Sequence, residues 1–188
     1  LAPTDYDFGN ASNYEFAENV TCANDEARKM FIEAYGHMLN YNHEQAIACF
    51  TATTELDPNC AMAWWGIAYC VSSNYNWSPG LGSGHDPIQQ ALKVMDHCTE
   101  LEQDLIRALS TRHSAEARDA ADPTVLNMGN DPALNVAFAE AMAPLYEKYA
   151  GNLDVTAIYV EALMNLKAWQ LWDKNTATGE ITPADDNT

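Results

Sequence analysis

The sequence predicts an all-α protein of about seven helices, and three observations support that fold class. Apolar residues recur every three to four positions over most of the 188-residue chain, which is the period of a helix with one buried face. Glycine and proline gather in a few short stretches, where they predict turns between the periodic segments. No stretch alternates apolar and polar residues in the way that a half-buried strand does.

The first part of the chain divides at residue types that start and stop helices. Residues 1–24 carry scattered aromatic side chains without a sustained period, and we expect an extended arm lying on the body. Asn24 is a suitable N-cap for the first helix. Pro58 ends the second helix, because the residue before a proline is displaced from the helical region. The first three helices are therefore expected at residues 25–40, 43–56 and 61–71.

A long loop separates these helices from the rest of the chain. Residues 74–87 contain four glycine or proline residues between Pro79 and Gly84, and a loop of this length is either functional or an insertion. The helical period then resumes, which makes residues 25–173 one helical domain, followed by a polar tail at 174–188. The four further helices are expected at residues 87–95, 101–117, 131–149 and 153–172.

The charge balance excludes one class of partner. The chain has 27 acidic and 9 basic residues, giving a net charge of −18. Phosphate binding requires clustered lysine and arginine, so we predict no nucleic-acid partner. No apolar run approaches the roughly 18 residues of a membrane span, so we also predict no transmembrane segment.

Cysteines and glycosylation sequons bear on the compartment of the protein. The odd number of cysteines excludes a complete set of intramolecular disulfides, and we expect most of these thiols to be reduced and buried. The start at Leu1 fits either a trimmed chain or removal of a targeting peptide, so the compartment stays open, with a lean to a processed secreted, periplasmic or lumenal protein. The cysteines are at 22, 49, 60, 70 and 98, and the sequons at Asn10, Asn19 and Asn76.

An internal repeat of 34 residues relates two of the expected helices. Ala46, Phe50 and Pro58 lie between the related helices, with small residues where helices approach each other and a large residue that fills the gap. A helix-turn-helix unit of this length and pattern resembles the tetratricopeptide repeat. The residues that superpose include Met30 with Trp64, Phe31 with Trp65, Ala34 with Ala68 and Tyr35 with Tyr69.

A longer segment resembles the start of a family of large tetratricopeptide-repeat proteins that carry the signature NHxxA…F…LDPxCAMAxWGxA. The likeness covers roughly residues 26–181 and implies a helical-repeat scaffold that binds proteins on a curved surface. Members of the family are longer and continue with further repeats and histidine-rich segments. The signature residues here are Asn42, His43, Ala46, Phe50, Leu56, Asp57, Pro58, Cys60, Ala61, Met62, Ala63, Trp65, Gly66 and Ala68.

The resemblance implies that the first helix of each pair lines a concave groove. We therefore predict a non-enzymatic scaffold whose aromatic groove binds a protein partner or docks the chain in a larger assembly. Adjacent helical residues point about 100° apart, so Trp64 is expected in the core and Trp65 in the groove. An alternative is that the arm folds back over Trp65. The groove residues are Arg28, Phe31, Tyr35, Met38, Trp65 and Tyr69.

Three further tryptophans are candidate contact residues. Trp77 lies in the long loop, which is the best local candidate for a functional element. Trp169 and Trp172 are three residues apart and are expected on one face of the last helix. Since a repeat array needs a polar cap at each end, this aromatic end is expected to contact the tail or another chain.

Two hypotheses come from other functional classes. In the first, a secreted or lumenal protein binds a metal or small molecule through His37, His43, His85 and the long loop. A cluster of His37 with Glu33 and Cys49 is conceivable, but no spacing matches a structural zinc site, so we predict no metal ligands and no cofactor. In the second, the chain is part of an enzyme whose catalytic residues lie downstream, and we assign no catalytic residue here.

Overall fold

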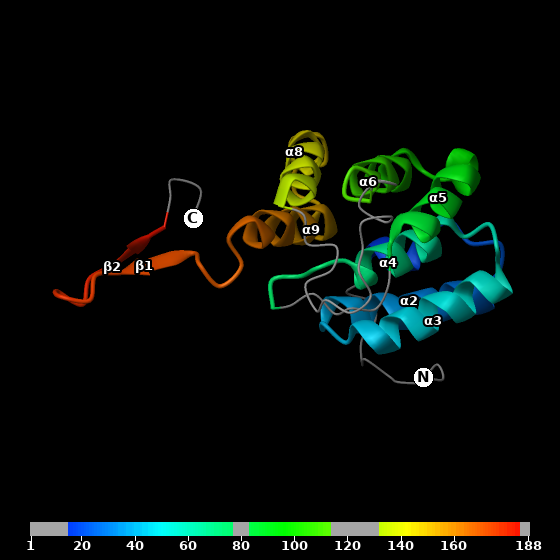
Figure 1. Cartoon of the computed structure of the whole chain (residues 1–188). Coiled ribbons are helices and arrows are strands. Elements are labelled where there is room, and N and C mark those ends of the chain that lie inside the picture. Colours follow the sequence, from blue (N-terminus) through cyan, green and yellow to red (C-terminus); the bar gives the residue numbers. More distant parts are fainter. Residues whose placement is uncertain (1–14, 77–82, 114–131, 185–188) are drawn as a thin grey trace.

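Helices make up most of the computed structural model, which describes residues 15–76, 83–113 and 132–184 (Figure 1). Each of the seven expected helices is present in the described residues, and a short α1 precedes them, which confirms the all-α prediction in its main features. The α-helices are α1 (Glu15–Glu18), α2 (Asp25–Leu39), α3 (His43–Leu56), α4 (Ala61–Val71), α5 (His85–Val94), α6 (Glu100–Ser110), α8 (Pro132–Lys148) and α9 (Leu153–Met164).

Helices α2, α3 and α4 pack one after another and begin and end close to the expected residues. The Asn24 side chain accepts a hydrogen bond from the Ala27 backbone N–H at 2.9 Å and so caps α2. Gly66 of α4 is required by this packing, because a Cβ atom there would lie 2.4 Å from the ring of Phe50 in α3. Side-chain volume at two signature positions therefore sets how closely α3 and α4 approach.

Helix α6 begins with a capping box and ends earlier than expected. The Thr99 hydroxyl accepts from the Glu102 backbone N–H, and the Glu102 carboxylate accepts from the Thr99 backbone N–H. The helix ends at Ser110 rather than near residue 117. The hydroxyls of Ser110 and Thr111 donate to backbone carbonyls three residues upstream, at 2.7 and 2.8 Å, and the chain leaves the helix there.

The last helix is also shorter than expected, and part of the predicted polar tail forms a hairpin. Helix α9 ends at Met164, a 3-10 turn η3 (Asn165–Lys167) follows, and Trp169 has a left-handed backbone with φ of 62°. Strands β1 (Trp172–Lys174) and β2 (Ile181–Pro183) then pair antiparallel. Figure 1 shows this hairpin extending away from the helices. The expectation that Trp169 and Trp172 share a helical face is therefore wrong.

The hydrophobic core lies between α2, α3, α4, α5, α6, α8 and α9, and the N-terminal segment contributes to it. Phe16, Ala17 and Val20 are buried, and residues 15–18 are helical rather than extended. The remainder of the predicted arm, residues 1–14, lies outside the described residues. None of the described helices is both long and apolar enough to cross a membrane.

Candidate functional site

The side chains predicted to line an aromatic groove are buried in the core. The α1 segment and α9 both cover this face of α2: the Phe16 ring lies 5.5 Å from the Tyr35 ring, and the Tyr35 hydroxyl donates to the Asp154 carboxylate at 2.6 Å. The prediction that these aromatic side chains line an exposed groove is therefore wrong for the described residues. Arg28 alone among the six is half-buried. The five buried side chains are Phe31, Tyr35, Met38, Trp65 and Tyr69.

The two adjacent tryptophans have the reverse of their expected roles. Trp65 is fully buried, and its indole N–H donates to the Leu105 carbonyl of α6 at 3.2 Å. Trp64 is only partly buried, and its indole N–H donates to the Pro58 carbonyl at 3.0 Å. The repeat register correctly separates the two faces of α4. Helix α6 covers the face that was expected to be open.

Three large apolar side chains of the C-terminal region are exposed. Trp169 is 72%, Trp172 61% and Ile181 62% exposed. The Trp169 ring stacks on Tyr75, with ring centroids 5.7 Å apart, and so joins the start of the long loop to the segment that follows η3. Trp77 lies outside the described residues. Of the predicted contact residues that the structure describes, Trp169 and Trp172 are the most accessible.

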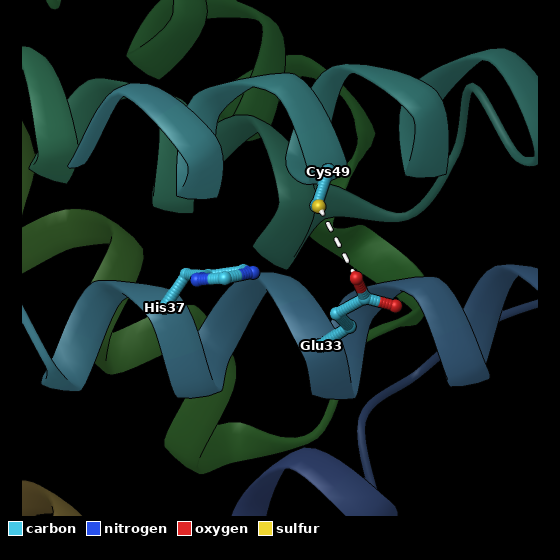
Figure 2. A group of neighbouring side chains, drawn as sticks. All are labelled: Glu33, His37 and Cys49. Carbon is cyan, nitrogen blue, oxygen red and sulfur yellow. Dashed lines mark hydrogen bonds between the residues drawn. The ribbon is translucent and has the colours of Figure 1, made fainter. Parts of the chain in front are cut away.

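Three potential metal ligands meet inside the α2–α3 helix pair. Glu33 and His37 are one turn apart on α2, and Cys49 faces them from α3 (Figure 2). One ligand atom from each residue lies within 4.8 Å of the other two, and all three residues are buried. The Cys49 thiol donates to Glu33 Oε1 at 4.0 Å. The sequence spacing of these three residues predicted no structural zinc site.

The chemistry of these ligands suits a transition metal. Thiolate, imidazole and carboxylate together are a zinc-type or iron-type donor set. Burial lowers the pKa of His37, with Glu33 opposing the shift, so the ring is neutral and able to ligate at neutral pH. The Asn42 side-chain amide nitrogen lies 3.2 Å from His37 Nδ1 and donates to it, which holds the orientation of the ring.

The other two histidines of the metal hypothesis lie elsewhere. His43 Nε2 is 3.3 Å from the Asn74 amide nitrogen, which joins the α2–α3 turn to the long loop. His85 Nδ1 is 3.0 Å from the Asp86 carboxylate at the start of α5. Neither belongs to the cluster of Glu33, His37 and Cys49. The three histidines of the hypothesis are therefore not brought together as one site.

A second polar group is buried where the C-terminal ends of α4, α6 and α9 meet. The Tyr69 hydroxyl donates to Glu161, and burial raises the pKa of the Glu161 carboxyl. The Arg112 guanidinium donates to the Ser73 carbonyl at 2.5 Å and to the Asn135 side-chain oxygen at 2.9 Å, and burial lowers its pKa. These contacts tie α4, α6, α8 and α9 together, and the Arg112 charge opposes the rise in the pKa of Glu161.

An open cleft of about 760 Å³ lies on the surface between α1, the start of α6 and the α8–α9 connection. It is lined in part by Glu102, Asp154 and the exposed Leu153. The Glu102 carboxylate is already engaged by both Thr21 and Thr99. No cluster of titratable groups with an evident catalytic geometry is found among the described residues lining this cleft.

Comparisons with family models, curated proteins and solved structures find no match to this chain. The tetratricopeptide likeness therefore rests on the motifs in the sequence alone. The polar group around Glu161 was missed by sequence analysis, because Tyr69 and Glu161 are 92 residues apart and no local pattern connects them. The exposed tryptophans were found, although on a different secondary structure from the one expected.

Proposed function

We propose that this chain is a non-enzymatic helical scaffold that docks on a protein partner or in a larger assembly. Its contact surface is the C-terminal surface, defined as Trp169, Trp172 and Ile181. One observation carries the proposal: these large apolar side chains are 61–72% exposed, while the helices bury most of theirs. Exposed large apolar side chains, tryptophan above all, are typical of protein contact sites.

The hairpin also has the properties of a docking element. Each strand has three residues, and the only strand pairing in the described residues is between β1 and β2. An isolated two-stranded hairpin is of marginal stability in water, so contact with a partner would stabilise it. The outer edges of both strands carry backbone groups that can pair with an added strand.

The resemblance to tetratricopeptide-repeat proteins supports the scaffold class, although the proposed surface differs from the concave groove of such repeats. The buried state of Trp65 and Tyr35 removes them from the contact surface. The successive packing of α2, α3, α4 and α5 supports a rigid body that presents the hairpin. The proposed role is therefore presentation of a small apolar surface by a stable helical body.

The test begins with the native mass of the protein from its own source. A complex heavier than the 20.8 kDa chain identifies a partner, which is then purified for titration calorimetry. Trp172→Ser should weaken its binding about 30-fold or more, as expected for a central contact residue. Leu153→Ser is the matched control, because Leu153 is 81% exposed but lies in α9. Equal loss in both variants, no loss in either, or a bare monomer in the source would contradict the proposal.

A second function, metal binding, is favoured by the cluster of Glu33, His37 and Cys49. In it, α2 and α3 hold one transition-metal ion, which links the two helices. The purified chain, stripped of metal and titrated with Co²⁺, should then bind about one equivalent and show a thiolate-to-cobalt charge-transfer band. Cys49→Ser should remove that band, whereas Cys70→Ser, at another buried cysteine, should retain it. No band with the wild-type chain, or equal loss in both variants, would overturn metal binding here.

A further inference from the structure

Two cysteines from distant parts of the sequence meet where the N-terminal segment passes the start of α4. Cys22 Sγ lies 3.0 Å from Cys60 Sγ, although the residues are 38 positions apart. This separation is only about 1 Å longer than the bond of a disulfide. Cys60 is fully buried and Cys22 is partly accessible.

The backbone on each side of Cys22 is held by hydrogen bonds that do not involve sulfur. Thr21 donates through its N–H and its hydroxyl to the Glu102 carboxylate, at 2.7 and 2.6 Å. The Ala23 N–H donates to Asp57 Oδ2 at 2.7 Å. Since both neighbours of Cys22 are anchored, the sulfur is held in place before any covalent bond forms.

Cys60 is held in the same way from the other side. It is the N-cap residue of α4, and its N–H donates to the Asp57 carbonyl at 3.0 Å. Asp57 therefore binds the backbone of Ala23 through its side chain and that of Cys60 through its carbonyl. This arrangement lowers the entropy that must be lost when the two sulfur atoms are joined.

We propose that Cys22 and Cys60 form an intramolecular disulfide. The oxidant is a small or protein disulfide, such as oxidised glutathione. The Cys22 thiolate, from the more accessible residue, attacks one sulfur of the oxidant and releases one thiol, which leaves a mixed disulfide. The Cys60 thiolate then attacks Cys22 Sγ and releases the second thiol. Two cysteine protons are lost, and the oxidant gains the two electrons as two thiols.

The 3.0 Å separation of the two sulfur atoms, rather than the acidity of the thiols, favours this pair. Burial raises the pKa of Cys98 to about 12, with Glu102 adding to the shift, so its thiol is a poor nucleophile. The neighbouring Cys22 thiol and burial raise the pKa of Cys60 too, which makes the second step slow in the folded protein. Once formed, the bond closes a loop containing α2 and α3 and fastens the N-terminal segment to the helical body.

Intact-mass measurement after denaturing alkylation tests the proposal. The full chain is first equilibrated with mixtures of reduced and oxidised glutathione. Of the five cysteines, three should take up the alkylating reagent in the oxidised protein and five after reduction, and peptide mapping should recover residues 22 and 60 linked. The oxidised form should also unfold about 10 °C higher.

Two variants separate this bond from the alternatives. Cys22→Ser changes the partly accessible residue and should leave all four remaining cysteines open to alkylation. Cys98→Ser should keep the bond, with two modifiable cysteines in the oxidised form. Five modifiable cysteines in the wild-type chain at every glutathione ratio would overturn the proposal. A peptide linking Cys98 to either residue in place of the proposed pair would overturn it as well.

Discussion

The α2–α4 segment and the C-terminal region from Asn165 onward place their aromatic side chains in opposite ways. In α2–α4 they form a contiguous buried group, with the Trp65 and Tyr69 rings 5.1 Å apart and the Phe31 and Phe50 rings 5.4 Å apart. In the C-terminal region Trp169 and Trp172 are exposed. Aromatic side chains therefore contribute to stability in one region and to an accessible surface in the other, and the packing of α6 and α9 makes the difference.

The largest expected effect compares one tryptophan from each region. Trp65→Ala removes a fully buried side chain and leaves the Leu105 carbonyl without its indole donor, so we expect a loss of about 3–5 kcal/mol in the free energy of unfolding. Trp172→Ala should change that free energy by less than about 0.5 kcal/mol. Urea unfolding followed by circular dichroism measures both. Similar losses in the two variants would remove the distinction between the regions.

Acid should weaken the helical body through His113, which is partly buried. Burial, with the nearby Arg112 charge, lowers the pKa of His113 to about 3, whereas the unfolded chain titrates near 6.5. Protonation therefore favours the unfolded state, and the stabilisation present above pH 6.5 is lost progressively as the pH falls toward 3.

The matched measurement uses His113→Gln, which does not titrate. Between pH 6.5 and 5 the wild-type chain should lose about 2 kcal/mol more than this variant. Unfolding free energies of both proteins at each pH provide the difference, so that effects of the acidic residues cancel. Parallel pH profiles would show that His113 does not remain neutral in the folded protein.

The capping box at the start of α6 should have a smaller effect. Thr99→Ala removes the hydroxyl that accepts from the Glu102 N–H, and we expect a loss of about 1 kcal/mol. Thr99→Ser keeps the hydroxyl and serves as the control, with a loss below about 0.5 kcal/mol. Thermal unfolding of the two variants measures the effect. Equal destabilisation would indicate that the methyl group of threonine, rather than the cap, is responsible.

The same two regions show what can be predicted from the sequence. The boundaries of α2, α3 and α4 were predicted closely, because local signals determine them: the Asn24 cap, the turn before His43 and the proline at 58. The end of α9 at Met164 was missed, because no glycine or proline marks it, and none marks the left-handed backbone at Trp169 that follows η3. Strands of three residues are too short for alternation to be recognised.

Which face of a helix is buried could not be predicted without knowing how the helices pack. The repeat register correctly placed Trp64 and Trp65 on different faces of α4. It could not predict which face is covered, because the covering helix α6 begins 35 residues after Trp65. The cluster of Glu33, His37 and Cys49 was considered from the sequence and was not selected, because no zinc-like spacing supported it. Its ligands lie on two helices, so only the packing of α2 on α3 brings them within 4.8 Å.

Hydroxyl-radical footprinting of the free chain and of its native complex tests the central claim most directly, namely that the contact surface is the C-terminal surface and not an aromatic groove. The account predicts that Trp172 and Ile181 are oxidised in the free chain and protected in the complex, while Trp65 is protected in both. Oxidation of Trp65 in the free chain, or equal oxidation of Trp172 in the free and bound states, would contradict it.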